Sequence, residues 1–333
     1  MVGLGLHHQL GYPADSPLTS WKTLLTMAAK GLRLDDWRPK HDNYPLAWEE
    51  LVLAASKAPR QIRSQRSKRL GGRSGDAPWV AERSVRRLIG EVLDACQGQC
   101  PTPPCPKGGR IVLDAIARLS EAGPLHILDF NFDCLLPTLL CVDLSSNAAK
   151  LPKAVSREVG SRISVVRGSD LESLYCRFPV PGGRAWLWKP HGYSKAHGRI
   201  RMGLRDYGLQ PALLKFAFDH YKRAEKLWCP SREVDQEKLR RRVSELDGSS
   251  GRRRSEDTWV TRALTLECIV IGLSISQSEW GLHWLFTQRA RNHARNGKLP
   301  SAQMFTQWPA GLPLGVSQSS FPSWAAAWNE IGR

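Results

Sequence analysis

The sequence predicts an α/β fold built on a doubly wound, mostly parallel sheet, and two observations lead to this. Short apolar runs of strand length alternate with longer helical patterns along most of the chain. Three of the runs end in glycine and polar residues, at 130–133 (Phe-Asn-Phe-Asp), 189–192 (Lys-Pro-His-Gly) and 272–274 (Gly-Leu-Ser). Open parallel sheets gather their ligand-binding groups at the carboxyl ends of strands. We therefore expect a Rossmann-like sheet with these segments at one edge.

The first half of the chain is predicted to be mainly helical before the first buried strand. Amphipathic patterns predict helices over 21–27, 44–56, 78–95 and 111–122. Across Gly123-Pro124 the chain enters an apolar run, 126–130, which is typical of a parallel strand buried on both faces. A helix over about 133–141 follows.

The second half continues the alternation. The candidate strands are 163–166, 185–189, 266–271 and 303–306, with a short strand at 199–202. The candidate helices are 209–228, 233–246, 279–296 and 322–331. We expect one domain over 1–333, in which 28–110 is a mainly helical insertion with a basic loop and 209–260 a helical, basic insertion, both covering the sheet.

Composition limits the class of protein. The chain has 333 residues, and no apolar stretch approaches the roughly 20 residues that span a bilayer. The start of the sequence lacks the charged-then-apolar order of a signal peptide, so we expect a cytoplasmic protein. Eight cysteines show no paired CxxC spacing, and only Cys96, Cys100 and Cys105 cluster. Since this spacing fits no common zinc module, we favour a proline-rich loop with reduced thiols and predict no metal.

The formal net charge of +17 favours ligands or partners with negative charge. Seven basic residues and no acidic residue lie between Lys57 and Arg73, and two arginine triplets lie at 240–242 and 252–254. These runs would contact nucleic-acid phosphates without sequence specificity, contact an acidic partner subunit, or be solvated insertions. Aromatic residues do not interleave with them, which argues against a stacking platform for single strands.

Four motifs occur in the order seen in sirtuin-like NAD-binding domains, and the chain most resembles the bacterial NAD-consuming branch found in antiphage defence. Residues 3–7 (Gly-Leu-Gly-Leu-His), with 11–13 and 21–25, resemble the family's glycine turn, glycine-x-proline and tryptophan helix. Residues 130–133 are similar to threonine-asparagine-tyrosine-aspartate, and 189–192 to lysine-leucine-histidine-glycine, followed by a short strand and a tyrosine, here Tyr207. Residues 272–276 resemble the late glycine-x-serine loop.

The resemblance implies hydrolysis of the bond between nicotinamide and ribose in NAD, which is the substrate, with no metal. This reaction passes through an oxocarbenium-like centre and needs a base that activates a nucleophile. His191 is the expected base, Asn131 would orient the ribose or a water, and Asp133 would favour the positive charge or cap the next helix. The residues expected to bind NAD are Gly3, Gly5, His7, Asn131, Asp133, Gly272 and Ser274.

Other functions stay open. A sirtuin-type protein deacylase would use the same pocket, but the CxxC pairs of the usual zinc lobe are missing. A non-catalytic scaffold or nucleic-acid-binding subunit is favoured by the short segment before Gly3 and by His7, which stands where the family has serine or threonine. A dehydrogenase is disfavoured because the full GxGxxG fingerprint is absent. The resemblance also implies restraint by homo-oligomerisation or by a regulatory partner, one possibility being a DNA-handling ATPase.

Overall fold

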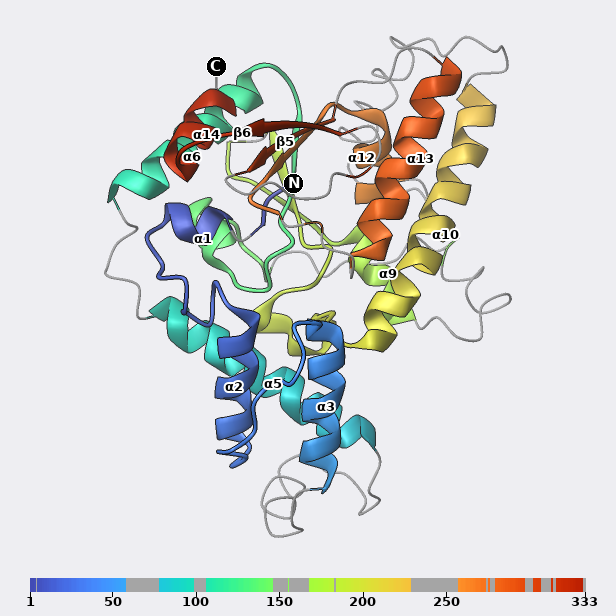
Figure 1. Cartoon of the computed structure of the whole chain (residues 1–333). Helices are drawn as coiled ribbons and strands as arrows, with labels where there is room; N and C mark the ends of the chain where they lie inside the picture. Colours follow the sequence, from blue (N-terminus) through green and yellow to red (C-terminus); the bar gives the residue numbers. More distant parts are fainter. Residues whose placement is uncertain are drawn as a thin grey trace.

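The computed structural model describes residues 1–3, 5–57, 78–98, 106–145, 155, 168–182, 184–228, 257–273, 275, 279–296, 302–306, 313 and 316–331. Within this part the chain is a mixed α/β protein (Figure 1). None of its helices is both long and apolar enough to cross a bilayer.

The strands form two three-stranded sheets with mostly parallel pairing. In the first, β3 (Ala185–Trp188) lies between β1 (Leu125–Leu128), which is parallel to it, and β2 (Arg177–Pro179), which is antiparallel. In the second, β5 (Ala302–Thr306) pairs in parallel with β4 (Cys268–Ile271) and β6 (Ser317–Ser320). Val2 makes parallel bridges to both Asp129 and Ile271, so the start of the chain joins the ends of β1 and β4.

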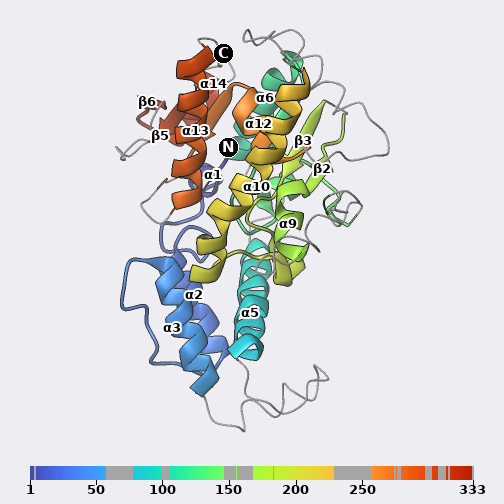
Figure 2. The same ribbon diagram turned by 90° about the vertical axis from the view of Figure 1, so that its right-hand side faces the viewer.

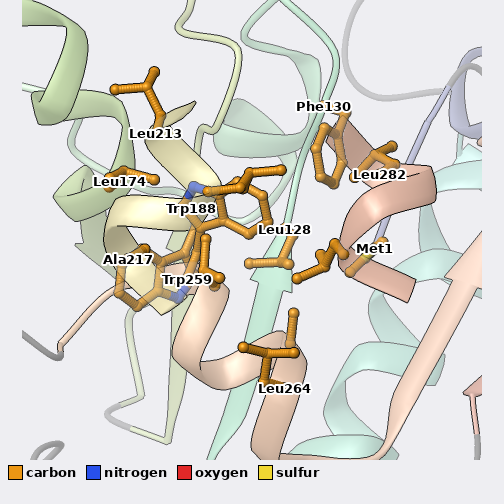
Figure 3. Close-up of a cluster of buried hydrophobic side chains, with 14 of the residues drawn as sticks. Met1, Leu128, Phe130, Leu174, Trp188, Leu213, Ala217, Trp259, Leu264 and Leu282 are labelled. Atoms are coloured by element: carbon orange, nitrogen blue, oxygen red, sulfur yellow. The ribbon is translucent and has the colours of Figure 1, made fainter. Parts of the chain in front are cut away.

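The strands β1, β3, β4 and β5 pack on both faces, as their apolar runs predict. Ile127, Leu187, Ile271 and Phe305 belong to one hydrophobic cluster, while the neighbouring residues Leu128, Trp188, Val270 and Met304 belong to another. This alternation follows from the two-residue period of a strand. Figure 3 shows the second cluster, in which Trp188 and Leu128 from the strands meet Trp259 and Leu282 from helices.

Helices cover the two faces. On one side lie α1 (Gly5–Gln9), α6 (Pro106–Glu121), α7 (Leu135–Leu139) and α14 (Trp324–Ile331). On the other lie α9 (Gly168–Tyr175), α10 (Leu204–Trp228), α12 (Trp259–Thr265) and α13 (Trp280–Asn296). Figure 1 shows α6 and α14 on one side of the strands and α12, α13 and α10 on the other.

Three helices form a separate group below the strands. They are α2 (Trp21–Gly31), α3 (Tyr44–Lys57) and α5 (Pro78–Gly98), and both views show them side by side (Figures 1 and 2). Leu25, Trp48, Leu51 and Ile89 are fully buried in a third hydrophobic cluster there. This group also packs on the 3-10 helix η1 (Ser194–Arg199), which connects it to the end of β3.

The coarse prediction of an α/β fold with parallel strands is confirmed, and two details differ. Residues 199–202, expected as a short strand, form no strand. Instead α10 begins at Leu204, because the Asp206 carboxylate accepts hydrogen bonds from the amides of Met202 (2.9 Å) and Gly203 (3.4 Å) and caps the helix early. The expected strand at 163–166, the helix at 233–246 and the basic runs beyond Lys57 lie outside the described residues.

Candidate functional site

The predicted motifs meet because the strands that carry them are parallel neighbours. Asp129 and Asn131 follow β1, Lys189 and His191 follow β3, and Gly272 follows β4. The register that pairs Leu128 with Trp188 brings the exits of β1 and β3 together at one end of the sheet. Residues 1–3 add a further strand-like segment between β1 and β4.

Lys189 follows β3, and its side chain is hydrogen-bonded to the turn that follows β1. Its side chain is fully buried, and Nζ donates to Asp129 Oδ2 at 2.8 Å, to the carbonyl of Asp133 at 2.9 Å and to the carbonyl of Asn131. Asp129 Oδ1 in turn accepts from the amide of Asn131 at 3.0 Å. A buried ammonium with three oxygen acceptors is a satisfied group, so Lys189 shapes the 129–133 turn and is not free for a ligand.

The two glycine turns pack against each other. Gly5 N–H donates to the carbonyl of Gly272 at 3.0 Å, and a Cβ added at Gly5 would lie 2.6 Å from Gly272 Cα. Gly272 itself has φ of +60°, which side chains rarely adopt. A Cβ at Gly3 would lie 2.6 Å from the Gly272 carbonyl oxygen. These glycines are therefore required for the contact between the two turns.

A cavity of about 990 Å³ opens at these strand exits. This volume includes space open to solvent. Polar groups line one part, and an aromatic group, with Trp21 stacked on Tyr44 and edge-on to Phe132, lines another. Its lining is formed by Gly3, Pro17, Leu18, Ser20, Trp21, Leu24, Tyr44, Pro45, Leu93, Phe130, Asn131, Phe132, Asp133, His191, Tyr207, Leu273 and Glu279.

His191 lies between aromatic rings at the cavity wall. Its ring is edge-on to Phe130 at a centroid distance of 5.0 Å and stacked with Phe132 at 5.9 Å, and its Nε2 lies 3.3 Å from the side-chain amide of Gln210. Burial and the nearby Lys189 ammonium lower the pKa of His191 to about 4. The ring is thus neutral at pH 7, in contrast to the near-neutral pKa that the sequence led us to expect.

Asn131 and Asp133 both line the cavity, and hydrogen bonds hold the side chain of each. The side-chain amide of Asn131 donates to the carbonyl of Gly3 at 3.2 Å, which fixes it between two strand exits. Asp133 Oδ2 lies 2.7 Å from His7 Nε2, and Oδ1 accepts from the amide of Leu135 at 2.9 Å. Burial alone would raise the pKa of Asp133, but the His7 ring and Lys189 lower it to about 2. Both oxygens of Asp133 are therefore engaged, one by His7 and one by the first amide of α7.

Glu279 is a functional candidate that the sequence analysis did not select. It precedes α13, lines the cavity, and its Oε1 accepts a hydrogen bond from the Tyr207 hydroxyl at 3.2 Å. Burial raises the pKa of Glu279 to about 7, although the Tyr207 hydrogen bond opposes this. Burial and Glu279 raise the pKa of Tyr207 well above 10, so the phenol remains a donor.

His191 and Tyr207 also line a second, smaller cavity. Its charged lining is already paired, since Asp206 accepts from Arg86 at 2.6 Å and Asp170 from Arg201 at 2.5 Å. These ion pairs hold the start of α10 against α5, and the segment before α10 against α9, and so fix the wall that carries Tyr207.

The structure thus brings together at one cavity Gly3, Asn131, Asp133 and His191. Gly5, His7 and Gly272 are buried and do not line this cavity. Ser274 lies outside the described residues, as do Cys100 and Cys105. In the part of the chain that the structure covers, no group of three His, Cys, Asp or Glu side chains is placed to hold a metal ion.

Comparisons of the chain with protein-family models, with curated proteins and with solved structures found no match.

Proposed function

We propose that the chain is an NAD hydrolase that cleaves the bond between nicotinamide and ribose, within a doubly wound sheet. The observation that carries the proposal is the cavity of about 990 Å³ at the strand exits, which gathers Asn131 and His191 with the Gly3 turn. These residues belong to motifs that lie more than 50 positions apart in the sequence. Such a meeting supports a common site.

The order of the strands supports the fold that this function needs. We count residues 1–3 as strand 1 and β1, β3, β4, β5 and β6 as strands 2 to 6. In this numbering the parallel strands lie side by side in the order 3-2-1-4-5-6. This is the order of dinucleotide-binding sheets, whose ligand lies where the strand order reverses, between strands 1 and 4. Gly3 and Leu273 follow those two strands and line the cavity.

Each residue has a role consistent with its surroundings. The cluster of aromatic side chains formed by Trp21, Tyr44 and Phe132 offers a flat apolar surface for a nucleobase, which is typical of cofactor pockets. Asn131, held by Gly3, orients the ribose. The neutral ring of His191 accepts a hydrogen bond from a ribose hydroxyl, and the surrounding aromatic rings exclude bulk water from the reacting bond.

Nicotinamide release from NAD by the purified chain tests the proposal, alone and with candidate partner proteins or DNA. Release by the wild type and by the exposed control His41→Ala, but not by Asn131→Ala or His191→Ala, is the expected result. Release that requires an acyl-lysine peptide would instead indicate a deacylase. Absence of both release and calorimetric NAD binding would leave the scaffold function. An effector that an oligomer or a partner restrains would release nicotinamide only in the presence of the signal that ends this restraint.

A further inference from the structure

Glu279 carries an acceptor oxygen that the fold leaves unused. Oε1 takes the Tyr207 hydroxyl hydrogen bond, whereas Oε2 is buried with no hydrogen-bond partner among the described residues. Both residues line the cavity that holds Asn131 and His191. A buried carboxylate oxygen without a donor is costly for the fold, so its retention at a cavity indicates a ligand or water that donates to it.

His191 is poorly suited to remove a proton from water. Its ring is surrounded by Phe130, Phe132 and Tyr207, and its only hydrogen-bond partner in the described chain is the Gln210 amide. The Asp206 carboxylate favours the imidazolium that would form, but burial and the nearby Lys189 ammonium outweigh it. A base works best when its pKa lies near the operating pH. The pKa of about 7 for Glu279 meets this condition, and the pKa of about 4 for His191 does not.

We infer that Glu279 is a further catalytic residue of the proposed hydrolysis, whose Oε2 accepts the proton of the attacking water, with Tyr207 as its positioning residue. The inference rests on the proposed function. The water oxygen forms a bond to the ribosyl carbon, the carbon–nitrogen bond breaks, and its electron pair leaves with nicotinamide as a neutral ring. The water proton passes to Glu279 and then to solvent, so the products are nicotinamide, ADP-ribose and a proton.

Tyr207 fixes the carboxylate and tunes it. Its hydroxyl donates to Oε1 and leaves Oε2 without a hydrogen-bond partner among the described residues. The titratable groups that share the cavity with Glu279 are Tyr44, Asp133, His191 and Tyr207. Of these, Tyr207 contacts the carboxylate directly and lowers its pKa, because the hydrogen bond stabilises the charged form.

The test measures nicotinamide release and NAD affinity for Glu279→Gln, Tyr207→Phe and the exposed control Glu330→Gln, from pH 5 to 9. Wild type and the control should gain activity with a midpoint near pH 7. Glu279→Gln should lose about 10²- to 10⁴-fold in kcat with NAD affinity unchanged within threefold, and its residual rate should not follow this midpoint. Tyr207→Phe should shift the midpoint upward and retain activity at high pH.

Azide distinguishes a missing base from a damaged pocket, because this anion attacks the ribosyl carbon without losing a proton. It should restore nicotinamide release to Glu279→Gln but not to Asn131→Ala. Wild-type activity that survives in Glu279→Gln, or a loss that azide does not restore, overturns the role of Glu279 and leaves the hydrolase standing. A wild type that releases no nicotinamide under any condition overturns both proposals.

Discussion

Replacement of Glu279 by glutamine should stabilise the protein above pH 7 and have little effect near pH 5. The side chain keeps its shape, but the amide cannot ionise. In the folded chain the pKa of Glu279 is raised by burial to about 7, against an ordinary value of 4.5. The folded state therefore binds a proton more tightly than the unfolded chain, and the stability that this proton confers is lost as the pH rises through 7.

The size of the effect follows from these two values. The difference between 4.5 and about 7 corresponds to about 3 kcal/mol of folding free energy that is absent once both states are ionised. Because the residue is partly exposed, solvent reduces this figure, and we expect Glu279→Gln to gain about 1 to 3 kcal/mol at pH 8.5 over wild type.

Urea denaturation at pH 5, 6, 7 and 8.5, followed by circular dichroism, measures the difference between the two proteins. Other groups titrate equally in both and cancel. Tyr207→Phe removes the donor that stabilises the carboxylate, so in that background the gain from Glu279→Gln should be larger. A difference that stays constant from pH 5 to 8.5 would show that Glu279 ionises normally, and would refute the reasoning.

Three further changes test the scaffold of the cavity. Lys189→Met should lose about 3 to 5 kcal/mol in urea denaturation by leaving the Asp129 carboxylate buried without its cation, and adding Asp129→Asn should recover part of the loss; simple additivity of the two losses would contradict this. Gly272→Ala should cost at least about 2 kcal/mol more than Gly11→Ala, since both have positive φ but only Gly272 faces close backbone; equal thermal shifts would argue against the contact. Because the pKa of His191 is lowered in the folded state, the unfolded chain takes up a proton on this side chain at a higher pH than the folded chain. Wild type should therefore lose up to about 3 kcal/mol of folding free energy relative to His191→Gln as the pH falls from 6.5 to 4. Parallel stability curves would contradict a pKa of about 4.

Local pattern was sufficient for the strands and helices with a strong period. The apolar runs of β1, β3 and β4 and the long helix α13 were predicted close to their observed bounds. The polar strand β6, Ser317–Ser320, was missed because it is specified by its partner β5 and carries no apolar pattern of its own. Likewise Asp206 extends α10 through a capping contact that propensity does not report.

The residues of the candidate site also differ in how far the sequence predicts their role. Asn131 and His191 could be predicted because each follows a recognisable strand. Glu279 gains its significance from a contact with Tyr207, 72 positions away, and from burial of its second oxygen, and neither is visible in sequence. The pKa of His191 likewise depends on rings and charges from other elements. A motif identifies a reactive residue, and tertiary packing decides its protonation.

The bridges of Val2 bear on the order in which the molecule is assembled during synthesis. Its partners, Asp129 and Ile271, lie 127 and 269 positions further along the chain, so this segment is synthesised before both of them and is among the last to find its place. Contacts of such long sequence separation are slow to form, because the chain between them must first be closed into a loop. The strands and helices up to β3 can pack before then, but the nascent chain keeps an open seam beside β1 until β4 emerges. Chaperone binding to the nascent protein should therefore persist until translation has passed residue 271.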